Sequence, residues 1–298
     1  MQGKHDVGFD DVAAIQSCSV AFSPPTGIAY NARRLRTYFT DLWNRREFAW
    51  FLAMGNLKAR NASTALGLFW WVLNPLLLGL VYFFVFGVLF GTRPPGYIAY
   101  LLSGMFVFHF TNQSMSGGAN AILQNAKLLA NLKFPRLVLL ASALIESSVG
   151  FLASMLVFYA IAWPATGIHP SRYTFLLLVV IPIQLLLNLG LSAIVARLAV
   201  PFRDINNLLP YFNRLWLYLT PIIWPLEFLE NLGPVVQTVV KFNPLFPLIS
   251  LYRSALIGRP EYPFQVDDLL MSLAWAVAIF LIGVAGFIRY ENRMVRYL

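Results

Sequence analysis

Residues 137–163 read LVLLASALIESSVGFLASMLVFYAIAW, an apolar stretch in which Glu146 is the only ionisable side chain. A helix needs about 20 predominantly apolar residues to cross the hydrocarbon core of a membrane. Inside lipid the backbone must satisfy its own hydrogen bonds, which a helix does within one segment. This stretch therefore predicts a transmembrane helix, and the rest of the chain repeats the pattern.

Five further apolar stretches are found at Leu66–Phe90, Tyr97–Ser116, Tyr173–Leu198, Leu208–Trp224 and Leu269–Ile288. The stretch at 208–224 is short and contains Arg214 and Pro221. Of the 298 residues 58% are hydrophobic and 12% charged, whereas soluble domains are roughly 45–50% apolar and about 25% charged. We expect an all-α integral membrane protein with a six-span transmembrane domain over 36–298. The polar residues 1–35 predict a disordered cytoplasmic tail.

An amphipathic segment precedes the first apolar stretch. Its aromatic and basic residues recur at roughly helical spacing, among them Trp43, Arg46, Trp50, Lys58 and Arg60. Tryptophan on an apolar face, with basic residues elsewhere, is typical of a helix lying in the membrane interface. An ordinary amphipathic packing helix is the alternative. The segment continues directly into the first apolar stretch, which favours a helix in the membrane interface.

The basic residues fall mostly on one side of the predicted spans. The connections after the first and third spans carry one each, Arg93 and Arg172, while the other side is rich in lysine and arginine. Because positive charge is retained on the cytoplasmic face, both termini are predicted inside a bacterial inner membrane that the chain crosses several times. The net charge of +9 thus reflects topology rather than nucleic-acid binding.

The segment between the fifth and sixth spans contains two short apolar pieces. Val235–Phe242 and Leu245–Ile257 are too short to cross a bilayer, so we expect two re-entrant or interfacial helices on the outer side. Asn243-Pro244 separates them. Non-helical backbone at that depth must be buried in protein or line an aqueous cavity. A channel gate and a simple surface cap are both compatible with this pattern.

The sequence contains no recognisable enzyme motif. There is no G-x-x-x-x-G-K-[ST] phosphate loop, no His/Cys metal spacing and no G-x-S-x-G. No cofactor is therefore expected in this chain. Ionisable residues inside spans often mark function, and His109, Glu146 and Arg214 qualify. A proton relay through His109 and Glu146 is one interpretation; a packing contact between Glu146 and a partner such as Arg214 is the other.

Aromatic side chains crowd the first, second and fifth spans. Most aromatic residues of a membrane protein belong to interface belts or face lipid, but some could line a channel and stack on sugar rings. The channel candidates are Trp70, Trp71, Tyr82, Phe86, Tyr100, Phe106, Trp216, Tyr218 and Trp224.

Short motifs follow one another in an order that is familiar from one family. They are Leu66–Trp70, Leu73–Pro75, Tyr100–Gly104, Phe134–Arg136, Phe202–Ile205, Thr220–Pro225, Phe242–Pro244 and Tyr252–Arg253. Together they resemble the membrane (permease) subunits of ABC type-2 exporters for O-antigen, teichoic acid and related polysaccharides. Each motif is weak alone, and Thr220 stands where the family commonly has serine.

The resemblance implies a homodimer of this chain with two copies of a separate ATPase, which would carry ATP and Mg²⁺. The substrate it implies is a lipid-linked polysaccharide such as O-antigen, galactan or a teichoic-acid-like glycan. It implies ATPase-coupling positions at Asn125, Lys127, Lys133, Phe134, Pro135, Arg136, Arg203 and Asp204. It also implies an outer gate that includes Val235, Phe242, Asn243, Pro244, Tyr252 and Arg253.

Two other classes of protein compete with an ATP-driven exporter. An ion-coupled secondary transporter or flippase would need functional ionisable groups within its spans and no ATPase partner. A membrane enzyme acting on a lipid carrier would need clustered acids near a membrane face, and its only candidates are Glu227, Glu230, Asp267 and Asp268. The missing phosphate loop suits a membrane subunit whose ATPase is a separate chain.

Overall fold

The computed structural model describes residues 37–61, 64–89, 96–131, 134–230 and 233–294. Within these ranges all regular structure is helical and no strand occurs. The chain divides into two compact units, 1–43 and 44–298. Of the first unit, residues 37–43 are helical and Trp43 is exposed. The predicted tail at 1–35 lies outside the described residues.

The second unit contains four long helices: α5 (Tyr97–Gln124), α7 (Leu137–Thr166), α8 (Leu177–Ala199) and α13 (Val266–Met294). The shorter helices are α3 (Arg46–Asn61), α4 (Trp70–Tyr82), α6 (Ala126–Asn131), α9 (Ile205–Leu219), α10 (Glu227–Glu230), α11 (Pro234–Lys241) and α12 (Leu245–Ile257). Two 3₁₀ turns, η1 (Gly67–Phe69) and η3 (Arg172–Leu176), and a π-helical segment, η2 (Phe83–Leu89), complete them.

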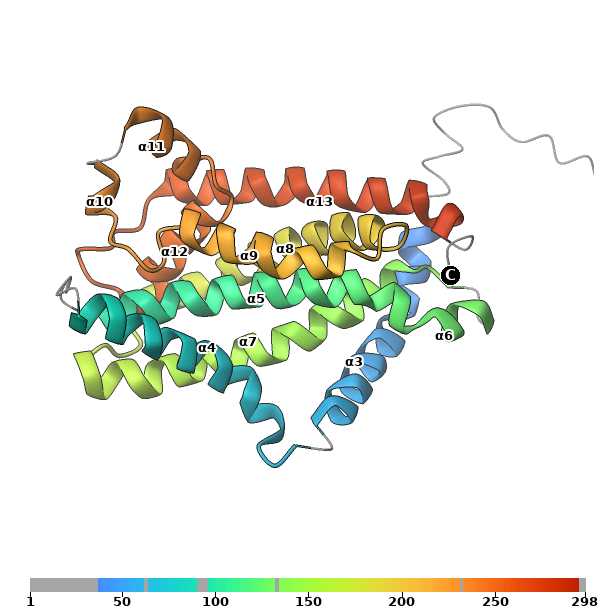
Figure 1. Ribbon diagram of the computed structural model, residues 1–298, viewed down its shortest axis with the longest axis horizontal. Coiled ribbons are helices and arrows are strands. Elements are labelled where there is room, and N and C mark those ends of the chain that lie inside the picture. The colour runs from blue at the N-terminus through green and yellow to red at the C-terminus, as the bar shows by residue number, and fades with distance from the viewer. Residues whose placement is uncertain (1–36, 62–63, 90–95, 132–133, 231–232, 295–298) are drawn as a thin grey trace, which may run out of the picture. The chain divides into compact units, whose positions relative to one another are not determined.

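Helix α5 is the centre of the second unit. It packs against α4, α7, α8, α9 and α12, and Figure 1 shows it running between α7 and α9. Most of its side chains from Tyr97 to Ile122 are buried. The helix continues past Ser116, the end predicted for the second span, to Gln124.

Three described helices are long and apolar enough to cross a membrane: Leu137–Pro164, Arg172–Ala199 and Val266–Glu291. These correspond to the third, fourth and sixth predicted spans. The prediction of an all-helical membrane protein is therefore confirmed, while the count of six spans stays a prediction.

The first and fifth predicted spans differ from the helices that replace them. The first, expected as one helix over 66–90, is divided into η1, α4 and the π-helical η2. The fifth, expected over 208–224, ends as a helix at Leu219. Thr220 precedes Pro221 and is extended, with φ −102° and ψ 136°, because the proline ring disfavours the helical region for the residue before it.

Glycine and serine allow the long helices to approach closely. A Cβ atom on Gly190 of α8 would lie 2.6 Å from the carbonyl oxygen of Ile279 in α13, and Gly283 of α13 faces Gly190. Likewise, a Cβ atom on Gly118 of α5 would lie 2.7 Å from the Cβ of Ser192 in α8. Small residues at helix contacts let backbones pack tightly where lipid gives no hydrophobic drive for association.

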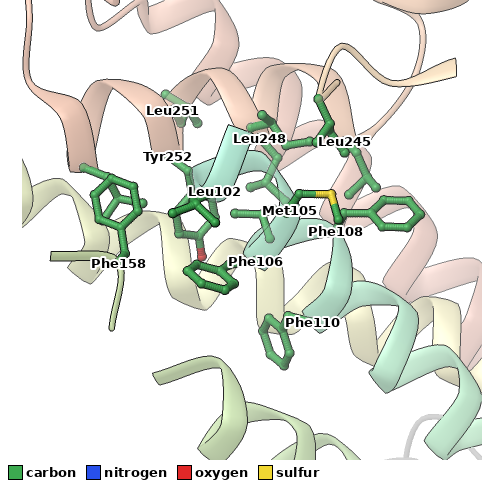
Figure 2. Packing of buried hydrophobic residues seen from close by; sticks show 14 of the residues in the cluster. Leu102, Met105, Phe106, Phe108, Phe110, Phe158, Leu245, Leu248, Leu251 and Tyr252 are labelled. Atoms are coloured by element: carbon green, nitrogen blue, oxygen red, sulfur yellow. The ribbon is translucent and has the colours of Figure 1, made fainter. Parts of the chain in front are cut away.

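The largest apolar cluster joins α5, α7 and α12. Figure 2 shows Phe106 and Phe110 of α5, Phe158 of α7 and Tyr252 of α12 in this cluster. Phe110 stacks on Phe151 with ring centroids 4.5 Å apart. All thirteen residues of α12 except Phe246 and Ser250 are buried, so α12 is a core element rather than a surface piece.

Contacts between helix termini define two ends of this bundle. At the Arg136 end, where α5, α8 and α13 finish and α7 begins, the Arg136 amide donates to Glu291 Oε1 at 2.9 Å. At the Arg259 end, where α7 finishes and α5 and α13 begin, Arg259 donates to the Thr166 carbonyl at 2.7 Å. The predicted cytoplasmic connections at 134–136 and 203–204 lie at the Arg136 end, and which face of the membrane this end occupies stays a prediction.

Candidate functional site

Of the coupling residues predicted in the 120–136 region, Phe134 packs on α3. Asn125 caps the end of α5, and its side chain donates to the Ala121 carbonyl at 2.8 Å. Beyond α6, the Phe134 ring meets the ring of Phe48 edge-on at 5.6 Å, and the Arg45 guanidinium lies 6.0 Å from its centroid. Pro135 is buried. The Lys127 side chain and all of Lys133 lie outside the described residues.

Arg136 joins the start of α7 to the end of α13. Besides the backbone bond, its guanidinium donates to the main-chain carbonyl of Glu291. Sequence reasoning missed Glu291 because it treated the carboxyl-terminal segment only as a source of positive charge. The acid beside Arg289 was visible in the sequence, but its partner is 155 residues away.

Arg203 and Asp204 form the short turn between α8 and α9. Both side chains are exposed. The carbonyl of Asp204 accepts from the Leu208 amide at 3.0 Å and so begins α9. The structure thus brings this turn to the same end of the bundle as Arg136. Their part in ATPase coupling stays a prediction.

Helix α3 combines a packed face with a large exposed apolar face. Ala49, Ala53 and Leu57 recur every four residues and are buried, and α3 packs against α7. Trp50 is 51% exposed and Phe51 is 71% exposed on the other side. Arg46 and Lys58 are exposed, whereas the Arg60 side chain lies outside the described residues. The packed face fits the prediction of an ordinary amphipathic packing helix. The exposed aromatic face fits the prediction of a helix lying in the membrane interface.

At the Arg259 end a buried arginine holds the segment after α9. Arg253 of α12 is 2% exposed. Its guanidinium carbon lies 3.4 Å from the centroid of the Tyr100 ring, and Nη2 donates to the Pro221 carbonyl at 2.6 Å. A cation buried against an aromatic face contributes about 2 kcal/mol or more. This contact offsets part of the cost of removing the charge from water.

Two tyrosines of α5 bind the same segment. Tyr97 donates its hydroxyl to the Ile223 carbonyl at 2.5 Å, and Tyr100 donates to the Trp224 carbonyl at 2.9 Å. These carbonyls have left the α9 helix and would otherwise lack partners in a buried environment. A cavity of about 180 Å³ adjoins them, lined by Tyr100, Arg253 and Glu261 among others.

Asn243 connects the two helices predicted as the outer gate to the end of α9. Its Oδ1 accepts from Trp216 Nε1 at 2.9 Å and from the Leu245 amide at 3.1 Å. Its Nδ2 donates to Thr220 Oγ1 at 2.8 Å. The predicted break at Asn243-Pro244 is present between α11 and α12. Val235 of α11 and Phe242, which follows α11, are exposed, whereas Tyr252 of α12 is buried. The gating role of these helices stays a prediction.

The aromatic channel candidates occupy different environments. Tyr100 and Phe106 are buried at 3% and 1% exposure, whereas Trp70 and Tyr218 are 38% and 49% exposed. Trp216 and Trp224 are partly buried. The side chains of Trp71, Tyr82 and Phe86 lie outside the described residues. Which of them lines a channel stays a prediction.

The ionisable residues of the spans lie on three different helices, α5, α7 and α9. His109 contacts Gln113 at 3.3 Å on α5, Glu146 lines a polar cavity beside α3, and Arg214 is exposed on α9. No group of three His, Cys, Asp or Glu side chains that could hold a metal ion occurs in the part of the chain that the structure describes.

Comparison with known proteins agrees with this architecture. The ABC-2 type transporter family model matches residues 48–257. The O-antigen export system permease protein RfbA of Myxococcus xanthus is 30% identical over 253 residues, which are 85% of this chain and 95% of that protein. A protein of the same name from Klebsiella pneumoniae is 27% identical over 244 residues, 82% of this chain and 92% of that protein. The resemblance found in the sequence is confirmed, and the chain belongs to the ABC-2 type transporter family.

Proposed function

We propose that this protein is the transmembrane subunit of an ATP-driven exporter that moves a lipid-linked polysaccharide out of the cytoplasm. The observation that carries the proposal is the match to O-antigen export permeases over more than nine-tenths of their length. A membrane component of this family does not itself hydrolyse ATP. A secondary transporter without an ATPase is not favoured by that match.

The proposed assembly is a homodimer of this chain with two copies of a separate ATPase, which binds ATP and Mg²⁺. Six spans, both termini in the cytoplasm, and docking of the ATPase at the Arg136 end belong to the same proposal. Support comes from the exposed turn at Arg203 and Asp204 and from the contact of Phe134 with α3. α11 and α12 would then close the path at the Arg259 end.

Depletion of the protein tests the function directly. We expect the surface polysaccharide to disappear while its lipid-linked form accumulates inside the cell, where extraction and mass spectrometry identify it. A phosphate-loop variant of the partner ATPase should give the same accumulation. Unchanged surface polysaccharide after complete depletion would contradict the proposal.

A further inference from the structure

Helix α5 carries a continuous row of polar side chains, here called the α5 polar stripe: His109, Asn112, Gln113, Ser116 and Asn120. Residues three and four apart lie on one face of a helix, so these five form a single row. Each is partly exposed, whereas residues of the other faces such as Phe110 and Met115 are buried.

Hydrogen bonds hold the side chains of the stripe but leave some of their donors and acceptors unused. Asn213 of α9 donates to Asn112 Oδ1 at 2.5 Å, and Asn120 donates to the Ser116 carbonyl at 2.9 Å. A side-chain amide offers two donors and one oxygen with two lone pairs. The oxygens of Gln113 and Asn120 have no hydrogen-bond partner among the described residues.

A polar cavity adjoins the stripe between α5, α7 and α3. Its volume is about 80 Å³, and its walls include three stripe residues together with Ser142, Glu146 and Asn56. Ser142 is 1% exposed, and its hydroxyl has no partner in the described ranges. A water needs about 10–15 Å³ of such volume and two to four polar partners, so the cavity has room for several waters.

This row of amides is incompatible with lipid. Other helices of the bundle turn large apolar side chains outward, such as Leu156 of α7 and Ile282 of α13, which are 76% and 68% exposed. Amides left without partners in hydrocarbon are costly, and polar residues at membrane depth face protein or an aqueous cavity. The stripe therefore faces other helices of the protein or an aqueous space rather than lipid.

We propose that the α5 polar stripe is the surface along which the exported glycan is hydrogen-bonded during transport, and that it suits an uncharged glycan. This inference rests on the proposed function. Side-chain amides and hydroxyls can both donate hydrogen bonds to sugar hydroxyls and accept hydrogen bonds from them. Each sugar unit of the glycan would therefore find equivalent hydrogen-bond partners as the chain moves along the stripe.

The charges near the stripe favour an uncharged polymer. Four of the five stripe residues, Asn112, Gln113, Ser116 and Asn120, cannot ionise, and His109 is the one titratable member. Glu146 on the cavity wall and Arg214, which follows Asn213 on α9, are of opposite sign. A polymer with a phosphate in every repeat is recognised by clustered arginines or lysines, and the stripe itself contains neither. A glycan without anionic groups therefore matches this surface better than a teichoic-acid-like one.

Cysteine labelling tests whether the stripe faces water. Ser116→Cys and Asn120→Cys, each in a Cys18→Ser chain assembled with its ATPase, would be treated in membrane vesicles with a small charged methanethiosulfonate. Leu156→Cys and Ile282→Cys are the matched controls. Because the reactive form is the thiolate, which needs water, we expect labelling at the stripe to be at least about tenfold faster than at the controls. Equal rates would overturn the inference.

Protection by the glycan tests the occupant. Labelling of Ser116→Cys should slow several-fold in cells that synthesise the glycan, compared with cells whose synthesis is blocked, and Ile282→Cys should not change. Labelling without protection, in cells that still export, would overturn the glycan contact and leave the proposed function intact. Failure of the proposed function would instead appear as normal surface polysaccharide after depletion of the protein.

The charge of the exported polymer tests the selectivity. Polysaccharide released from the cell surface would be applied to an anion-exchange column at neutral pH. We expect it to pass unretained. A glycan retained because each repeat carries phosphate or carboxylate would overturn the uncharged-substrate inference.

Discussion

The two ends of the bundle differ in how deeply their polar residues are buried. At the Arg259 end, Arg253 and Asn243 are buried and bind the protein's own backbone and side chains. At the Arg136 end, Arg203 and Asp204 are exposed. A buried polar group that loses its partner costs far more than an exposed one. Substitutions at the Arg259 end should therefore change stability, whereas those at the Arg136 end should change function while the fold survives.

The largest effect is expected from Arg253→Met. The variant removes the cation from the Tyr100 ring and the shorter of two hydrogen bonds to the Pro221 carbonyl, which keeps the Tyr100 hydroxyl as a donor at 3.1 Å. We therefore expect a loss of about 2–4 kcal/mol of stability and a loss of export. The measurement is thermal unfolding of the purified complex. Arg172→Met, at an exposed arginine of the same end, is the control, and an unchanged melting temperature in Arg253→Met would refute the comparison.

Asn243→Leu should have the next largest effect. Trp216 Nε1 and the Leu245 amide lose their acceptor, whereas Thr220 Oγ1 keeps its bond to the Trp216 carbonyl. Each unsatisfied group costs about 1–3 kcal/mol when buried. We expect a lower melting temperature and faster proteolysis between α11 and α12. Thr238→Ala on exposed α11 removes only a local bond to the Pro234 carbonyl and should leave both unchanged. Equal proteolysis of the two variants would show that Asn243 does not hold this junction.

Arg136→Ala should weaken the link between α7 and α13 by about 1 kcal/mol, the usual contribution of one hydrogen bond. ATP hydrolysis by the complex should continue while export falls, because a contact between moving parts is lost and the core is not. Glu291→Gln keeps the oxygen that accepts from the Arg136 amide and should export nearly normally. The idea fails if the two variants export equally well.

Asp204→Arg should have the smallest effect on stability, within about 0.5 kcal/mol, because exposed substitutions rarely exceed that range. Export should nevertheless fall with ATP hydrolysis retained, if the turn between α8 and α9 contacts the ATPase. Asp267→Arg places the same change on an exposed site at the other end. Wild-type export by Asp204→Arg would mean that the residue merely flanks the membrane.

Much of the fold was predictable because apolar composition acts locally. The stretch at 137–163 became α7, and the stretch at 173–198 became η3 and α8. The fifth span was predicted too long since its apolar composition continues beyond Pro221, where backbone geometry ends the helix. The second span was predicted too short. The residues after Ser116 resemble a loop in composition, but they continue α5 because they are packed inside the protein.

The site was harder to predict because its partners are distant in the sequence. Arg253 was assigned to the outer segment, but nothing in the sequence pairs it with Tyr100 or Pro221. Asn112 and Gln113 lie within the second predicted span, yet their alignment with Ser116 and Asn120 becomes meaningful only once α5 is known to continue to Gln124. Aromatic residues were favoured as channel candidates; Tyr100 and Phe106 are buried in the structure, and which of the candidates lines a channel stays a prediction.

The glycine contact between α8 and α13 has a mechanical consequence. With Gly190 and Gly283 in backbone contact, neither helix can slide past the other without driving a side chain into a main chain. The pair should move as one stiff rod, and α13 alone, with 29 residues, is about 44 Å long at ~1.5 Å per residue. If α13 tilts slightly at the contact between Glu291 and Arg136, its other end near Val266 should therefore move sideways, because the helix pair bends little.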